Sequence, residues 1–176
     1  MAIREVLAYP EPVLAEKAEP VEEVDSGIKE LIADMIETMY GARGIGLAAN
    51  QVGVAKRVIV LDVPDFDDEE SARGDNLVAL VNPEIKEAGG TTKYEEGCLS
   101  VPGVTADVVR SERVTVAGLD GEGNPVEINA EGLFAIALQH EIDHLDGVLF
   151  IDRLSRLKRD LIKRKLRKAQ ARETAL

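Results

Sequence analysis

Two histidines, His140 and His144, lie four residues apart in the segment QHEIDHLDG (139–147), and the 176-residue chain has no others. In an α-helix, residues four apart lie on the same face, so both imidazole rings can point toward one cation. Glu141 follows the first histidine directly, where its carboxylate can reach a water on the metal without binding the metal itself. The H-E-x-x-H spacing therefore predicts a metal site with two histidine ligands and a general base.

A packed helix whose histidines only form hydrogen bonds is the alternative interpretation. Leu133, Ile136 and Ala137 share the histidine face of this segment. A second face is also apolar and carries Phe134, Leu138, Ile142 and Leu145. A helix that is apolar on two sides is buried. Two imidazoles and a carboxylate inside the protein each need a partner, and one metal ion satisfies all three, which favours the metal site.

The third ligand should come from upstream of the histidines. Catalytic sites of this kind usually have three protein ligands and one open position. No histidine follows His144, and the only later glutamate is Glu173, in the charged tail. Cys98, the single cysteine, is the strongest candidate, because thiolate is a strong ligand and Gly97 permits a close turn. The alternative for a lone cysteine is a small buried apolar residue. By ligand type, a Cys-His-His set suits zinc.

The elements that must position these residues follow an α+β order. A helix is expected over 26–43, with Ser26 as its cap, and glycines then end it in a flexible turn. The expected strands cover 57–62, 76–85, 91–99 and 108–119, followed by a hairpin turn at 121–124. The histidine helix should cover 131–146 and stop at Gly147, and a last helix should cover 152–172. Because helices and strands do not alternate, we expect small antiparallel or mixed sheets around the central histidine helix.

Composition indicates one soluble globular domain over residues 1–176. Hydrophobic residues make up 45% and charged residues 31% of the chain, and the length lies within the usual range of a single domain. Aromatic residues make up only 3%, which argues against a stacking surface for single-stranded nucleic acid. No apolar run approaches the ~18 residues of a membrane span. The N-terminus lacks a secretory signal, and a single cysteine excludes an intrachain disulfide. We therefore expect a cytoplasmic protein, although a processed organellar protein fits the same features.

Charge is unevenly distributed along the chain. Residues 153–176 hold ten basic residues against Asp160 and Glu173, a net charge of +8, which leaves −20 on the rest. This basic tail, which includes the C-terminal helix expected over 153–172, predicts an anionic partner. The alternative is a solvated terminal helix that packs on the body. Residues 64–75 are acidic but lack EF-hand spacing, so a surface loop is favoured over a cation site.

Three motifs, GIGLAANQ (44–51), EGCLS (96–100) and QHEIDHLDG (139–147), resemble those of the peptide deformylases and occur in the same order. The resemblance extends from about residue 3 to residue 152. It implies a metal-dependent hydrolase that removes the formyl group from the N-terminal formyl-methionine of nascent polypeptides and releases formate. It also implies a monomer with one divalent metal ion per chain. Ferrous iron is the expected ion in the cell, with zinc, nickel or cobalt as alternatives.

The same resemblance implies roles for individual residues. Cys98, His140 and His144 would bind the metal, a water would fill the fourth position, and Glu141 would act as general base and acid. The physical chemistry agrees, because a bound metal ion lowers the pKa of its water and a carboxylate can carry the proton to the leaving amine.

Substrate contacts are implied as well. The side-chain amide of Gln51 and the backbone N–H of Leu99 would bind the carbonyl oxygen, and Ile45 and Gly46 would lie beside the peptide backbone. The pocket for the methionine side chain would include Leu133, Ile136 and Ala137. Some family members anchor the peptide with an arginine after EGCLSVP, and this chain has Thr105 near that place. Bacterial members with a basic C-terminal helix dock it on the ribosome near the exit tunnel, which makes the ribosome an expected partner here.

Two other functions are compatible with parts of the sequence. A zinc metalloprotease of the H-E-x-x-H type would cleave internal peptide bonds, but the usual downstream ligand is missing. A non-catalytic ribosome- or RNA-binding protein with a structural metal would normally show four protein ligands, and the sequence offers three.

Overall fold

The computed structural model describes residues 2–65 and 68–174. In chain order, its helices and strands are α1 (Ser26–Gly41), β1 (Gly46–Ala48), β2 (Val58–Asp62), β3 (Leu77–Gly89), β4 (Thr92–Cys98), β5 (Val101–Arg110), β6 (Arg113–Leu119), β7 (Pro125–Glu131), α2 (Gly132–Leu145) and α3 (Arg156–Thr174). Short 3-10 turns lie at Pro12–Ala15, Ala49–Val52 and Phe150–Arg153. The predicted α+β class is confirmed. None of the described helices is long and apolar enough to cross a membrane.

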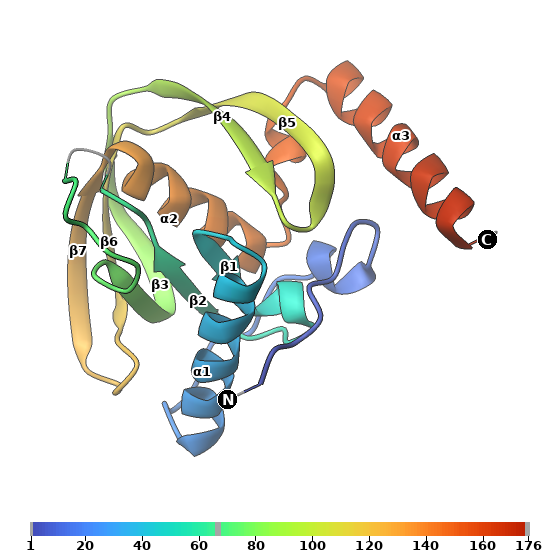
Figure 1. Ribbon diagram of the computed structural model, residues 1–176. Helices are drawn as coiled ribbons and strands as arrows, with labels where there is room; N and C mark the ends of the chain where they lie inside the picture. The colour runs from blue at the N-terminus through green and yellow to red at the C-terminus, as the bar shows by residue number, and fades with distance from the viewer. Residues whose placement is uncertain (1, 66–67, 175–176) are drawn as a thin grey trace.

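Two antiparallel sheets enclose α2. The larger sheet has the strand order β1-β2-β3-β6-β7, and β4 and β5 form a separate two-stranded sheet. Figure 1 shows α2 running across the middle of the molecule, with the larger sheet on one side and the β4–β5 hairpin over the other. This arrangement leaves the histidine helix at the centre, as the sequence predicts, with a strand end from the hairpin close above it.

Strand β2 is buried on both faces, because a helix covers each of them. Ile59 and Leu61 belong to a cluster that includes residues of α2, whereas Val58 and Val60 belong to a cluster that includes residues of α1. The sequence of a strand that packs on both faces is continuously apolar rather than alternating, and VIVL (58–61) has this pattern. These two clusters hold α2 and α1 on opposite faces of the same strand.

Helix α2 confirms the prediction of a buried helix. Every residue from Ala135 to Leu145 is buried. The predicted stop at Gly147 is also confirmed, since this residue has φ 76° directly after the helix cap. A side chain there would bring its Cβ within 2.5 Å of the carbonyl oxygen of Ala15, so both backbone conformation and space require glycine.

Three details of the expected elements are wrong. The cap of α1 is Asp25 rather than Ser26, and its Oδ1 accepts a hydrogen bond from the backbone N–H of Ile28 at 3.0 Å. Strand 108–119 is interrupted after Arg110, because Ser111 turns the chain from one sheet into the other. The expected flexible turn after α1 includes β1, which pairs with β2. The cap is a local feature, since Asp25 and Ser26 are neighbours and either type can cap a helix. The other two cases depend on strand partners far away in the sequence, which local residue patterns cannot show.

Helix α3 lies at the edge of the molecule and points away from the sheets (Figure 1). It begins at Arg156, four residues later than expected, because Phe150–Arg153 forms a separate 3-10 turn. Ile162 and Leu166 are half-buried against an apolar cluster, whereas Leu157 is 72% exposed. The buried residues of this cluster are Val101 and Val108 of β5 with Leu149, Phe150 and Ile151. The last residues of the predicted basic tail, 175–176, and residues 66–67 of the acidic loop lie outside the described residues; the rest of that loop is mostly exposed.

Candidate metal centre

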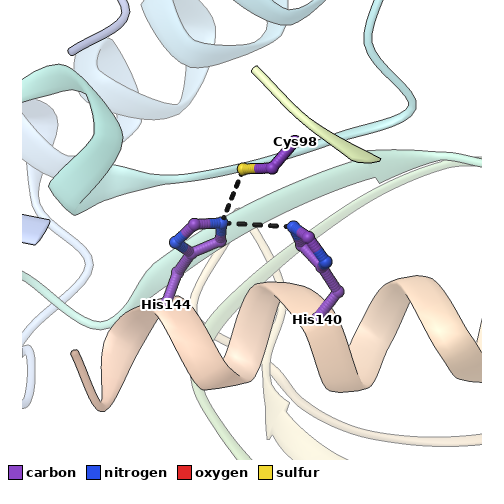
Figure 2. Close-up of side chains that lie close together, drawn as sticks. All are labelled: Cys98, His140 and His144. Atoms are coloured by element: carbon purple, nitrogen blue, oxygen red, sulfur yellow. Dashed lines mark hydrogen bonds between the residues drawn. The ribbon is translucent and has the colours of Figure 1, made fainter. Parts of the chain in front are cut away.

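Three side chains converge on one point between β4 and α2. Figure 2 shows Cys98 reaching down from the end of β4 toward His140 and His144, which both rise from α2. The Cys98 Sγ lies 3.3 Å from His144 Nε2, and this nitrogen lies 3.2 Å from His140 Nε2. One ligand atom from each residue falls within 4.8 Å of the others. The three residues that the sequence proposes as ligands are therefore brought together.

The two separations from His144 Nε2, 3.3 Å to Cys98 Sγ and 3.2 Å to His140 Nε2, fit a single metal ion. At a tetrahedral centre with bonds of about 2.0–2.3 Å, neighbouring ligand atoms lie about 3.3–3.6 Å apart. Burial lowers the pKa of His144 well below its ordinary value, so this ring is neutral and can bind a metal. Its Nδ1 is buried and has no hydrogen-bond partner among the described residues. Its Nε2 is the ring nitrogen that faces Cys98.

A carboxylate orients the other histidine. Glu96, two residues before the cysteine, contacts His140 Nδ1 through its Oε1 at 2.8 Å, so His140 presents its Nε2 to the site. Burial alone would raise the pKa of Glu96, but hydrogen bonds from Arg110 and His140 more than offset this and hold it below its usual value. Glu96 is therefore a carboxylate, which fixes the ring orientation of His140 and keeps a proton on its Nδ1, so that Nε2 is the nitrogen available to a metal.

Glu141 is a buried acid beside the three ligands. Its side chain is buried, and within the part of the chain that the structure describes its Oε2 has no hydrogen-bond partner. Burial raises the pKa of this carboxyl to about 7, against the opposing effect of the nearby His140 charge. A Cβ on Gly46 would come within 2.7 Å of Oε1 of Glu141, so only glycine at this position leaves the carboxyl where it is.

Gln51 and Leu99 adjoin the same point from two directions. Gln51 Nε2 lies 3.6 Å from the Cys98 Sγ and donates to Ser100 Oγ at 3.0 Å. Its Oε1 accepts a hydrogen bond from the backbone N–H of Ala48 at 2.9 Å, which turns the NH₂ group toward the cysteine. Leu99 directly follows the cysteine, so its backbone is fixed by the same strand end.

A pocket of about 530 Å³ opens onto this centre. Its lining includes ten residues predicted from the sequence: Ile45, Gly46, Gln51, Cys98, Leu99, Leu133, Ile136, Ala137, His140 and Glu141. The remaining predicted residue, His144, is fully buried beneath them. Thr105 also lines the pocket, from strand β5. The pocket is therefore apolar on its α2 side and carries a carboxyl, a thiol and an amide at its inner end, as a site for an apolar side chain next to a reacting group requires.

A model of the polypeptide deformylase family matches residues 3–160. The chain belongs to this family. The match confirms the resemblance drawn from the three motifs and extends it by a few residues at the C-terminal end. It also favours the deformylase interpretation over the metalloprotease and the non-catalytic RNA-binding protein.

Curated relatives and solved structures agree with the family assignment. A peptide deformylase from Alkalilimnicola ehrlichii is 55% identical over 168 residues, which cover 96% of this chain and 91% of the relative. The crystal structure of a peptide deformylase from Legionella pneumophila superimposes with a TM-score of 0.86 at 48% identity, covering 98% of both chains. The Ehrlichia chaffeensis peptide deformylase in complex with actinonin gives 0.88 at 42% identity, covering 96% of this chain and 98% of the other.

Sequence reasoning missed several residues at this deformylase centre. Three further residues line the pocket: Arg43, Tyr94 and Glu95. Nothing in the sequence around them distinguishes them from ordinary surface residues. Glu96 could have been found, because residues two apart in a strand share a face and Cys98 was already a candidate ligand. Asp143 could also have been found from the sequence, since an acid on a helix that is apolar on two sides needs a buried partner.

Proposed function

We propose that this chain removes the formyl group from the N-terminal formyl-methionine of nascent polypeptides and releases formate. The observation that supports this most is the juxtaposition of the Cys98–His140–His144 group with the buried carboxyl of Glu141, which has no hydrogen-bond partner among the described residues on its Oε2. Membership of the deformylase family supports the reaction itself. We further propose that residues 1–176 form one catalytic domain and that the protein acts as a cytoplasmic monomer.

Glu141 is the proton carrier in this proposal. A divalent ion held by Cys98, His140 and His144 would supply a water nucleophile and Lewis-acid polarisation of the formyl carbonyl. Glu141 takes the proton from the attacking water and passes it to the amine that leaves. A carboxyl whose pKa is about 7 suits both steps, because each protonation state is accessible near neutral pH. Such proton transfer typically contributes about 10²–10⁴ in rate.

Gln51 and Leu99 stabilise the charge that develops on the formyl oxygen. The Nε2 of Gln51 already points toward the cysteine ligand, and its orientation is held from behind by the backbone N–H of Ala48. The backbone N–H of Leu99 lies next along the chain from the same cysteine. Preorganised donors of this kind are typically worth about 10²–10³ each in rate.

The peptide backbone lies along Ile45 and Gly46. Among the described strands, β1 is an edge strand that pairs with β2 alone, so its other edge can pair with an extended peptide in the pocket. The methionine side chain then enters the apolar side of the pocket formed by Leu133, Ile136 and Ala137. Methionine is unbranched and flexible, so this surface can hold it without polar contacts.

The ion in the cell is ferrous iron in this proposal, with zinc, nickel or cobalt able to occupy the same ligands. One ion binds per chain, because the described residues bring together a single Cys-His-His group. A thiolate ligand on ferrous iron makes the enzyme sensitive to oxygen, since the cysteine can be oxidised.

Helix α3 is the proposed contact with the ribosome. Its exposed face carries Arg164, Lys165 and Lys168, while Ile162 and Leu166 hold the helix against β5. Basic residues that neutralise phosphates give salt-dependent affinity. Replacing these three basic residues by glutamine should weaken ribosome binding at low salt without disturbing the packed face. Equal sedimentation of the variant and the wild type with ribosomes would remove this part of the proposal.

Formate release from a formyl-Met tripeptide tests the proposed reaction. Protein purified without oxygen and loaded with ferrous iron or nickel should release formate, and the Glu141→Gln variant should release at least about 10²-fold less. The variant must retain one ion per chain, which metal analysis can verify. A folded, metal-loaded wild type that releases no formate would overturn the proposed function.

A further inference from the structure

A continuous series of ion pairs connects the metal centre to the segment before α3. It begins at His140, whose Nδ1 contacts Glu96 at 2.8 Å. Glu96 is held in turn by Arg110 through two bonds, from Nε to Oε2 at 2.8 Å and from Nη2 to Oε1 at 2.9 Å. Bidentate arginine–carboxylate pairs fix geometry as well as charge. The position of Arg110 therefore determines the position of Glu96, and through it the direction of the His140 ring.

The series continues beyond the arginine to the molecular surface. Arg110 Nη1 donates to Asp143 Oδ2 at 2.5 Å. Arg153 donates to both oxygens of the same carboxylate, from Nη2 to Oδ1 at 2.7 Å and from Nε to Oδ2 at 3.1 Å, so Oδ2 accepts from both arginines. Asp143 lies on α2 between the two histidines, whereas Arg153 ends the Phe150–Arg153 turn. A residue outside the catalytic pocket thus holds the last carboxylate of the series.

Exposure changes sharply along this series. The side chains of Arg110 and Glu96 are each 4% exposed and that of Asp143 is 11% exposed, whereas that of Arg153 is 50% exposed. A hollow of about 300 Å³ on this side of the molecule is lined by Arg110, Asp143 and Arg153. Arg153 therefore lies between the buried ion pairs and solvent.

Arg153 also balances the negative charge of the carboxylates in this series. The two arginines and two carboxylates of the series, Arg110 and Arg153 with Glu96 and Asp143, balance one another in charge. Removing Arg153 leaves two buried carboxylates for one guanidinium, and Asp143 then faces the hollow with only one ion-pair partner. Arg110 would be drawn toward Asp143 and water, which weakens its bidentate hold on Glu96, because breaking one partner of a buried ion pair is costly for those that remain.

We infer that Arg153 is a positioning residue for the metal centre: it fixes Asp143 and, through Arg110 and Glu96, the His140 ring that binds the ion. The inference rests on the proposed metal site. It assigns the segment before α3 a role in metal retention that is separate from any role of α3 in binding a partner.

The test is the rate at which metal leaves the protein. Arg153→Ala protein loaded with cobalt or zinc is mixed with excess chelator, and release is followed by the absorbance of the chelator complex. Loss of a direct partner of a metal-binding histidine typically costs about 10–100-fold in metal affinity. Arg153 acts through three intervening side chains, so we expect release that is roughly three- to tenfold faster than in the wild type, at or below the lower end of that range.

Arg113→Ala is the matched control. This arginine is 59% exposed, pairs with the carboxylate of Glu112 at 3.7 Å, and lies on β6 away from the metal centre. Its release rate should equal that of the wild type. Arg153→Lys keeps the charge but cannot bond both oxygens through a planar fork, so its release rate should lie between those of the wild type and Arg153→Ala.

Several outcomes decide the inference. Equal release rates for Arg153→Ala and Arg113→Ala would overturn it, even if Arg153→Ala melts at a lower temperature without metal, because that result would mean a merely structural role. Faster release that is not increased further when Asp143→Asn is added would support it, because both changes interrupt the same series. Failure of the wild type to bind one ion per chain would overturn the inference together with the proposed function, whereas equal rates with metal bound would leave the proposed function intact.

Discussion

Replacing Glu141 by glutamine should stabilise the metal-free protein at neutral pH and leave its stability unchanged in acid. Burial raises the pKa of Glu141 from 4.5 to about 7 in the folded protein. Between these two pH values the folded protein keeps a proton that the unfolded chain has lost. The proton contributes stability that is fully present below pH 4.5 and is lost as the pH rises through about 7. Glutamine is neutral throughout and of nearly equal size, so this loss does not occur.

The magnitude follows from the size of the shift. A difference of one pKa unit corresponds to about 1.4 kcal/mol, so ionising Glu141 inside the fold costs about 3 kcal/mol by pH 7 and above. For a chain of this length, 1 kcal/mol changes the melting temperature by roughly 2–4 °C, which gives an expected increase on the order of 6–12 °C for the variant. A bound divalent ion lowers the pKa of the neighbouring carboxyl, so the difference should become smaller when metal is present.

Thermal and urea unfolding of metal-free protein, followed by circular dichroism from pH 4 to pH 8, measures this effect. The quantity that matters is the difference between variant and wild type at each pH, because titrating groups that do not interact with Glu141 contribute equally to both. Glu127→Gln, an exposed acid on β7, serves as the control and should show no pH-dependent difference. Parallel stability curves for the wild type and Glu141→Gln would refute the reasoning, since they would mean that the Glu141 carboxylate is ionised in the fold at no cost.

Three further predictions concern catalysis by the metal-loaded enzyme. Gly46→Ala should lower kcat for formate release by about 10²-fold, because the added Cβ would lie 2.7 Å from Oε1 of Glu141 and displace it, while the melting temperature changes little. Gln51→Ala should lower kcat by about 10²–10³ with little change in KM, whereas Gln51→Glu, which adds a negative charge beside the formyl oxygen, should be at least as poor. The rate constant kcat/KM should fall tenfold per pH unit on the acid side, with an apparent pKa at or below 7, because protonated Glu141 cannot accept the water proton and the bound ion stabilises its ionised form. Steady-state assays of formate release measure all three, run from pH 5 to pH 9 for the last. An acid-side apparent pKa of kcat/KM above 7 would contradict the assignment of Glu141 as the base.

The metal ligands could be predicted because local periodicity determines much of their geometry. His140 and His144 are four residues apart on a helix, and this spacing alone places their rings on one face. Cys98 required a different argument, since a single cysteine far along the chain has no local relationship to the helix. It was found because the helix provided two ligands and the rest of the chain offered few others. The structure brings all three together within 4.8 Å.

The ion pairs behind the ligands could not be predicted, because they depend on tertiary contacts. Arg110 lies in a segment of alternating polar and apolar residues, where a surface position is the ordinary expectation for arginine. It is buried only because the β4–β5 hairpin folds over α2 and presents this end of β5 to Asp143. The same non-local event explains the break at Ser111, whose N–H donates to Gln139 on α2 at 3.0 Å. A sequence pattern shows neither the fold of the hairpin nor the face that it covers.

The two-residue repeat of a strand and the four-residue spacing of a helix together place the side chains of the metal centre. Glu96 and Cys98 are two residues apart on β4, so they share the face that meets α2, and His140 and His144 are four residues apart on that helix. Cys98 therefore faces His144, at 3.3 Å, while Glu96 faces His140, at 2.8 Å. One strand supplies both a ligand and the carboxylate that orients another ligand. This arrangement explains why Glu96 and Cys98 must keep their spacing: an insertion of one residue between them would turn Glu96 to the solvent face and leave His140 without its partner.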